Sequence, residues 1–126
     1  MICVDTSSLV AFLSGGSGAD LEQVERALAG RSLLLPPVVQ TEVLSDPGLR
    51  AAARAAILDL PLADLLPGFW GRAGELRARI LKAGRKARLA DALISQTALD
   101  LDVPLITRDR DFRAYRRYGH LRLVEP

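Results

Sequence analysis

Four acidic residues stand at positions from which they could act together on one metal ion. Asp5 ends the first apolar segment, Glu42 and Asp91 lie near the starts of two predicted helices, and Asp109 follows a late apolar segment. Several carboxylates packed together repel one another unless they bind a proton or a cation. Oxygen ligands favour Mg²⁺ or Mn²⁺, which can activate water for phosphodiester hydrolysis. With one cysteine and one histidine, the chain has no zinc site built from those residue types.

Apolar runs alternate with segments of helical spacing along the chain. The runs predicted as buried strands are residues 2–4, 32–35, 104–107 and 121–124, with a weaker candidate around 63–65. Helices are predicted at residues 9–13, 20–28, 37–46, 48–58, 71–83, 89–101 and 109–118. This alternation is typical of an α/β fold. We expect a three-layer sandwich with a mostly parallel central sheet flanked by helices.

The predicted topology brings the four acids to one edge of the sheet. Ligands of parallel sheets bind beyond the carboxyl ends of the strands, where Asp5 and Asp109 both lie. The helix that carries Asp91 leads into the strand before Asp109 through a tight connection, so its first turn returns to the same edge. Glu42, in the second turn of its helix, lies about 8 Å along the axis from the helix start. We therefore expect the four carboxylates to point at one place.

Each acid also has an ordinary structural role open to it. Asp5 and Asp109 could cap the helices that follow them, Asp91 could favour a helix dipole, and Glu42 could be a solvated helix residue. The metal site is favoured because the four acids occur together in the predicted fold.

Basic charge is concentrated in the second half of the chain. Residues 72–122 carry thirteen basic residues against six acidic ones, although the net charge of the whole chain is only +2. Such a distribution favours a polyanionic partner. The bases that precede Asp91 at near-helical spacing include Arg79, Lys82, Lys86 and Arg88. We predict that these four form a phosphate-binding rim beside the acids, with a merely solvated face as the alternative.

The length of 126 residues suits one domain with one core, and we expect a single domain over residues 1–126. No apolar run approaches the ~18 residues that a membrane span needs. The first residues also lack the basic and apolar regions of a secretory signal. We therefore expect a cytoplasmic protein that has no membrane anchor.

Four segments of the sequence resemble the PIN-domain ribonucleases, and among them the VapC toxins of prokaryotic toxin–antitoxin pairs. They are ICVDTSSL at residues 2–9, TEVLSDP at 41–47, LADALISQTA at 89–98 and LITRDRDF at 105–112. Their order and spacing extend over nearly the whole chain. The resemblance implies a PIN-like fold and Mg²⁺- or Mn²⁺-dependent endonucleolytic cleavage of RNA by metal-activated water.

The resemblance also implies roles for individual residues and partners. The metal-binding and catalytic acids of the family match Asp5, Glu42, Asp91 and Asp109. Thr107 resembles a hydroxyl that steadies the site, Ser7 is expected to do the same, and Asp111 resembles an acid that sometimes supplements the cluster. VapC-like proteins usually form homodimers and are blocked by a small VapB-type antitoxin, so we expect both partners. The antitoxin should contact the apolar helix at 9–13, which has more apolar residues than one buried face needs.

Other functions are compatible with the same fold. One alternative is a PIN-like module that binds RNA or protein without cutting, although the presence of all four acids argues against it. Another is a free-standing PIN nuclease without an antitoxin. A phosphatase of the haloacid dehalogenase type would need a second aspartate where this chain has Ser7. The leading hypothesis is a metal-dependent ribonuclease that serves as the toxin of a type II toxin–antitoxin system.

Overall fold

The sheet at the centre of the computed structural model, which describes residues 1–126, contains four short parallel strands. They are β1 (Ile2–Val4), β2 (Leu33–Leu34), β3 (Leu105–Ile106) and β4 (Leu123–Val124). Their order is β2-β1-β3-β4. Cys3 aligns with Leu34 on one side and with Leu105 on the other, so β1 lies inside the sheet. The four apolar runs predicted as strands are confirmed, each at or within its predicted bounds.

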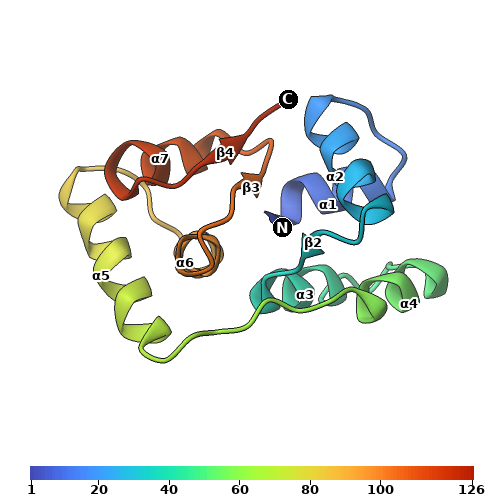
Figure 1. Cartoon of the computed structure of the whole chain (residues 1–126), viewed down its shortest axis with the longest axis horizontal. Helices are drawn as coiled ribbons and strands as arrows, with labels where there is room; N and C mark the ends of the chain where they lie inside the picture. The colour runs from blue at the N-terminus through green and yellow to red at the C-terminus, as the bar shows by residue number, and fades with distance from the viewer.

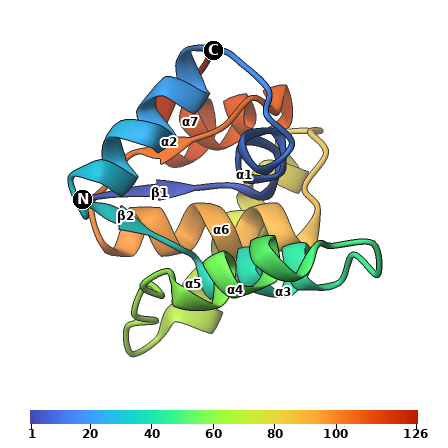
Figure 2. The same ribbon diagram turned by 90° about the vertical axis from the view of Figure 1, so that its right-hand side faces the viewer.

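Helices cover both faces of this sheet. They are α1 (Thr6–Leu13), α2 (Ala19–Ala29), α3 (Pro37–Leu44), α4 (Ala51–Asp59), α5 (Phe69–Lys82), α6 (Leu89–Asp100) and α7 (Arg113–Gly119), with a 3-10 turn η1 (Arg110–Phe112). β1 runs between α2 and α6, and α5 packs against both α6 and α7 (Figures 1 and 2). The predicted α/β sandwich is therefore the observed architecture. None of the helices combines the length and the apolar character that crossing a membrane requires.

The core extends over both faces of the strands. Cys3 and Val4 of β1, like Leu105 and Ile106 of β3, are fully buried. Because helices cover a parallel sheet on both sides, successive strand residues are apolar and do not alternate with polar ones. This burial explains why the strands are recognisable in the sequence as continuous apolar runs.

Two predicted elements take a different form. The weak strand expected around residues 63–65 is absent, and a single parallel bridge pairs Leu35 with Leu62 instead. Extension of this ladder toward residues 63–65 would need an N–H of Pro37 to donate to the Ala63 carbonyl, but Pro37 has none and begins α3. The helix expected at 109–118 is divided into η1 and α7, because the Asp109 side chain caps the short 3-10 turn first.

The helix α5 begins earlier than predicted, at Phe69 instead of residue 71. Gly68 precedes it with a φ of 82°, a conformation that costs glycine little. Phe69 and Trp70 therefore lie in the first turn of the helix. Phe69 is buried against the core, whereas 67% of Trp70 is exposed.

Candidate metal centre

The carboxyl ends of β1 and β3 meet where the strand order of the sheet reverses. From β1 the chain continues to β2 on one side and returns to β3 on the other. Parallel sheets bind their ligands at such switch points. Asp5 follows β1 directly, and Thr107 and Asp109 follow β3. The first and last acids of the predicted site therefore lie at the same edge of the sheet.

The carboxylate of Asp5 is held by three donors. Its Oδ2 accepts hydrogen bonds from Thr107 Oγ1 at 2.7 Å and from Ser7 Oγ at 2.8 Å. Its Oδ1 accepts from the backbone N–H of Ser8 at 3.0 Å, so the side chain also caps α1. Asp5 is 2% exposed, and burial raises its pKa despite these hydrogen bonds, with the charge of Asp109 adding to the rise. Both expected roles, helix cap and site acid, are therefore compatible in one residue.

Three further carboxylates gather next to Asp5. Oxygens of Asp91, Asp109 and Asp111 lie within 4.8 Å of one another. Asp91 is in the first turn of α6, while Asp109 caps η1 by accepting from the Asp111 N–H at 2.9 Å. The backbone N–H of Asp109 donates to Thr107 Oγ1 at 3.0 Å. Thr107 thus connects Asp5 to this group, and Asp111, expected only to supplement the site, is one of its three members.

Asp5, Asp109 and Asp111 all lie close enough to Asp91 for their charges to act on it. The pKa of Asp91 is raised to about 6, first by burial and then by the charges of Asp109, Asp111 and Asp5, while Arg88 opposes the rise. The negative charges of these carboxylates repel one another, and a bound cation would relieve that repulsion. Carboxylate oxygens are the ligands that Mg²⁺ and Mn²⁺ prefer. The donor set therefore fits either ion.

Glu42 lies at the margin of this group. It is exposed in the second turn of α3, and its Oε1 accepts a hydrogen bond from Thr6 Oγ1 at 2.6 Å. Thr6 follows Asp5 in the chain, so this contact ties α3 to the end of β1. The structure thus places Glu42 near Asp5 but outside the group formed by Asp91, Asp109 and Asp111.

The four bases predicted to bind phosphate fall into two pairs. Lys86 Nζ lies 3.4 Å from Asp111 Oδ2, and Arg88 precedes α6 close enough to lower the pKa of Asp91. Arg79 and Lys82 are in the last turn of α5, where Arg79 donates to the carbonyl of Tyr118 at 3.4 Å. The structure therefore brings Lys86 and Arg88 to the acids, whereas Arg79 is attached to the end of α7.

A buried ion pair behind the site was missed by the sequence reasoning. Asp20, in the first turn of α2, is 0% exposed and accepts from Arg108 Nε at 2.8 Å and from Arg108 Nη2 at 3.0 Å. It also accepts from Ser8 Oγ at 2.9 Å. Since Arg108 stands between Thr107 and Asp109, this pair holds the segment after β3 against α1 and α2. No local pattern reveals it, because an acid in a first helical turn is common.

The hydroxyl of Tyr115 is a second feature that sequence reasoning did not assign to the site. Tyr115 is 0% exposed, and its hydroxyl has no hydrogen-bond partner. Burial, together with the nearby charge of Asp91, raises its pKa to about 12. The phenol therefore keeps its proton at neutral pH. The hydroxyl is therefore an unpaired, buried hydrogen-bond donor close enough to Asp91 to sense its charge.

Comparisons with known proteins agree on one fold. A family model described as the PIN domain matches residues 2–118. The structure is similar to VapBC2 from Rickettsia felis, solved bound to a DNA fragment from their promoter. That match has a TM-score of 0.72 and 20% identity, and covers 100% of this chain and 99% of the other.

Two more solved structures have a similar fold. FitAcB from Neisseria gonorrhoeae matches with a TM-score of 0.71 and 17% identity, over 100% of this chain and 98% of that one. VapBC-5 from Mycobacterium tuberculosis, a member of the VapBC family of toxin–antitoxin systems, matches with a TM-score of 0.65 and 22% identity, over 98% and 97% of the two chains. A search of curated protein sequences finds no match.

Proposed function

The chain belongs to the PIN domain family, and on this basis we propose that it is a metal-dependent endoribonuclease, the toxin of a type II toxin–antitoxin system acting in the cytoplasm. The observation that carries the proposal is the group of Asp91, Asp109 and Asp111, with oxygens within 4.8 Å of one another. This group lies beside the buried Asp5, at the edge of the sheet where parallel folds bind ligands.

The proposed catalytic and metal-binding acids are Asp5, Glu42, Asp91, Asp109 and, from its position, Asp111. Mg²⁺ or Mn²⁺ bound there would supply an activated water and positive charge for phosphodiester hydrolysis. The chain itself keeps the carboxylates in place. Ser7 and Thr107 orient Asp5, and Thr107 also accepts from the Asp109 amide. Such preorganisation lowers the cost of arranging the site during the reaction.

RNA would reach these acids across the basic residues of α5 and the loop before α6. Lys86 and Arg88 stand next to Asp111 and Asp91, and Arg79 and Lys82 extend the rim along α5. Phosphate contacts of this kind give affinity without sequence preference. Because of their positive charge and their positions, we propose that these four residues bind the RNA backbone.

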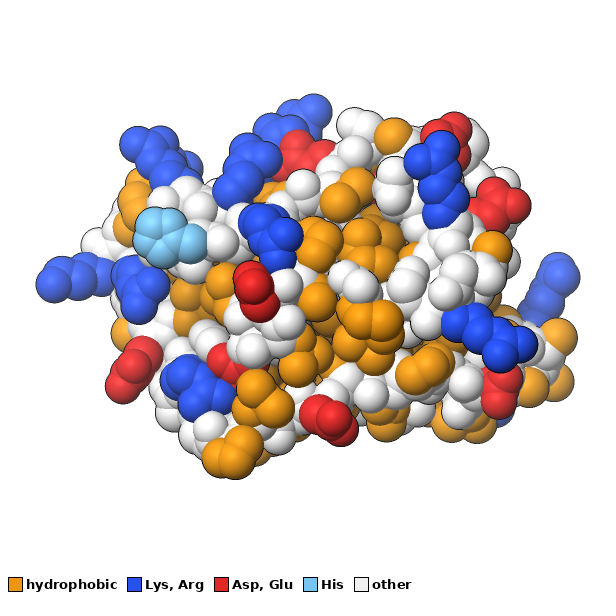
Figure 3. All heavy atoms as spheres, in the orientation of Figure 1, with side chains coloured by type: hydrophobic (Ala, Val, Ile, Leu, Met, Phe, Trp, Pro, Cys, Tyr) orange, Lys and Arg blue, Asp and Glu red, His pale blue; other side chains and the backbone are white.

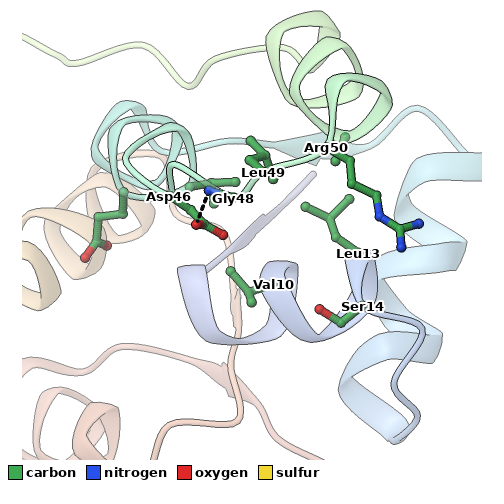
Figure 4. Close-up of a pocket in the computed structure, with 10 residues that line it drawn as sticks. Val10, Leu13, Ser14, Asp46, Gly48, Leu49 and Arg50 are labelled. Carbon is green, nitrogen blue, oxygen red and sulfur yellow. Dashed lines mark hydrogen bonds between the residues drawn. The ribbon is translucent and has the colours of Figure 1, made fainter.

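A VapB-type antitoxin would bind to this chain in a groove between α1, α3 and α4 (Figure 4). This groove has a volume of about 430 Å³, and Val10, Leu13 and Leu49 form its apolar walls. Leu9, which was expected to share the surface, is instead buried in the core. Glu42 lines the same groove, so an arginine of the antitoxin inserted there would meet a metal-binding acid. The VapBC structures with the same fold support a partner of this type.

The proposed homodimer has a candidate surface on α5 and α6. Trp70 is 67% exposed, and it lines two apolar hollows together with Leu93. Leu89, at the start of α6, is 62% exposed and borders one of them. Large exposed apolar side chains that adjoin one another are typical of association surfaces. A second copy of the chain would cover them.

The decisive experiment is a cleavage assay on mixed RNA with added Mg²⁺ or Mn²⁺, or with EDTA. Wild-type protein should cut only with the metal, and D5N and D91N should be inactive. The D59N variant, which changes an exposed acid at the end of α4, serves as the matched control and should cut normally. Wild-type cleavage that persists in EDTA would refute the metal site. Tight RNA binding without cleavage would favour the non-catalytic module.

The toxin assignment needs a test of its own, which is expression with and without the adjacent small reading frame. Growth and yield should be normal only when that frame is present, since an exposed ribonuclease harms its host. Free expression without toxicity, with cleavage intact in vitro, would leave a free-standing nuclease.

A further inference from the structure

A second pocket adjoins the acids, and most of the residues that line it are basic. It lies between the loop that connects α5 to α6 and the segment formed by η1 and α7, and its volume is about 430 Å³. The basic residues that line it are Arg85, Lys86, Arg110, Arg113, Arg116 and Arg117. The one acid among its walls is Asp111. Figure 3 shows Lys and Arg side chains gathered over the α7 side of the molecule, at the upper left.

Part of this positive charge is already paired. Arg113 contacts Glu125 through two hydrogen bonds of 3.0 Å, and Arg116 lies 3.7 Å from the same carboxylate. Lys86 lies 3.4 Å from Asp111.

The three remaining guanidinium groups, those of Arg85, Arg110 and Arg117, form no ion pair within the chain. Arg110 is close enough to Glu125 to help lower the pKa of that carboxyl, and Asp111 is the one acid in the pocket wall, so basic charge outnumbers acidic charge there. Arginine forks are suited to the paired oxygens of a phosphate.

The pocket is continuous with the metal centre. Asp111 both lines the pocket and belongs to the group with Asp91 and Asp109. An RNA strand whose scissile phosphate lies at the acids must extend away from them on at least one side, and its neighbouring phosphates need positive charge there. The pocket supplies that charge immediately next to Asp111.

We propose that this pocket, centred on Arg85, Arg110 and Arg117, binds the phosphodiester backbone of the RNA strand next to the scissile bond. The inference rests on the proposed ribonuclease function. Of the four predicted rim residues only Lys86 lines the pocket, so Arg85, Arg110 and Arg117 are added to the proposed RNA contacts. Tyr118 also lines the pocket, and the guanidinium carbon of Arg117 lies over its ring, 5.4 Å from the ring centroid. A nucleobase can extend this stack, since bases stack on guanidinium planes as well as on aromatic rings.

The test compares two double variants of equal charge change. R85Q/R117Q removes two unpaired guanidinium groups of the pocket, and R26Q/R54Q removes two exposed ones from α2 and α4. Binding of a fluorescent single-stranded RNA is measured by anisotropy in EDTA over a series of salt concentrations, which requires no cleavage.

The slope of log affinity against log salt should flatten by about 1.4 units in R85Q/R117Q, since each lost contact to a single strand is worth about 0.7. R26Q/R54Q should keep the wild-type slope. R85K/R117K should also keep it, because the charges remain.

Competition identifies what the pocket binds. Unlabelled RNA should displace the probe from wild-type protein at far lower concentration than inorganic phosphate, a mononucleotide or a hexaglutamate peptide. Preferential displacement by the mononucleotide would overturn the RNA subsite in favour of a free nucleotide. Preferential displacement by the peptide would assign the pocket to an acidic protein segment.

The inference and the proposed function can fail separately. If wild-type protein cleaves RNA with metal but R85Q/R117Q binds with the wild-type slope, the pocket is not a subsite although the nuclease assignment holds. If wild-type protein neither binds nor cleaves RNA, both are refuted. Thermal melts of each variant, expected at the wild-type temperature, exclude misfolding as the cause of a flattened slope.

Discussion

Replacing Asp91 by asparagine should stabilise the metal-free protein at neutral pH while it abolishes cleavage. Asp91 is 9% exposed, and burial and neighbouring carboxylates raise its pKa from 3.8 to about 6. A difference of this size between the folded and unfolded chains corresponds to about 3 kcal/mol lost from the free energy of unfolding once the group is ionised. No hydrogen bond contributes to the shift, so asparagine removes the charge without breaking one.

The sign of the effect gives it a characteristic pH dependence. Because the folded-state pKa lies above the unfolded value, the unfolded chain releases this proton first as pH rises. Ionisation of Asp91 therefore costs the wild-type protein no stability below about pH 4, and this cost grows progressively up to about pH 6. The difference between D91N and wild type should be near zero at the acid end and should reach about 3 kcal/mol at neutral pH.

Urea denaturation in EDTA, followed at several pH values, measures this difference. D59N serves as the control, since Asp59 is exposed on α4 and its loss should leave stability unchanged at every pH. Adding Mg²⁺ should reverse the order of the two proteins, because only the wild type keeps the full set of acids to bind it. A D91N variant that is no more stable than wild type at neutral pH, or a difference that does not vary with pH, would refute the reasoning.

Three further results are expected. T107V should lower the free energy of unfolding, measured in urea, by about 1–3 kcal/mol, because Asp5 loses a hydrogen-bond donor and the Asp109 amide loses its acceptor. T107S keeps the hydroxyl and should retain most of the wild-type stability. D20N should lower the free energy of unfolding at neutral pH, since the partly exposed Arg108 loses the buried carboxylate with which it pairs. Because hydrogen bonds from Arg108 lower the pKa of Asp20, thermal melts should show this loss in full above about pH 4, and it should decline below that and vanish as pH falls through the folded-state pKa. W70S should leave the melting temperature nearly unchanged, because the indole is mostly exposed, yet give a monomer by light scattering; a W70S dimer would exclude this surface as the interface.

Most of the fold could be predicted from the sequence because it depends on local patterns. The strands are short apolar runs, with β3 fully buried and β4 partly buried. An acid follows β1 and a hydroxyl follows β3, at the edge where the chain leaves the sheet. The parallel order follows from the helices between them. The error around residues 63–65 has a local cause in the opposite segment: Pro37, which follows β2, has no N–H to extend the pairing beyond one bridge and begins α3 instead.

The site was less predictable because its details depend on distant partners. Asp20 has an ordinary first-turn position, and only its contact with Arg108, 88 residues later, makes it part of the support for the acids. Asp111 was expected only to supplement the site, yet the tight turn of η1 brings it into the group with Asp91 and Asp109. The excess of arginine was visible in the composition, but its division between paired and unpaired groups depends on the position of Glu125.

The hydrogen bond between Thr107 and Asp5 joins residues 102 positions apart, and this separation matters while the chain is being made. Because synthesis proceeds from the N-terminus, Asp5 is translated well before Thr107, Asp109 and Asp111. A nascent chain that stops before β3 has β1 paired on one side only, with an open strand edge and one acid of the switch point. The segment that contains β3 must therefore be translated before the carboxylates can assemble. Copies truncated before β3 would expose the open edge of β1 and would lack two of the acids of the proposed metal site.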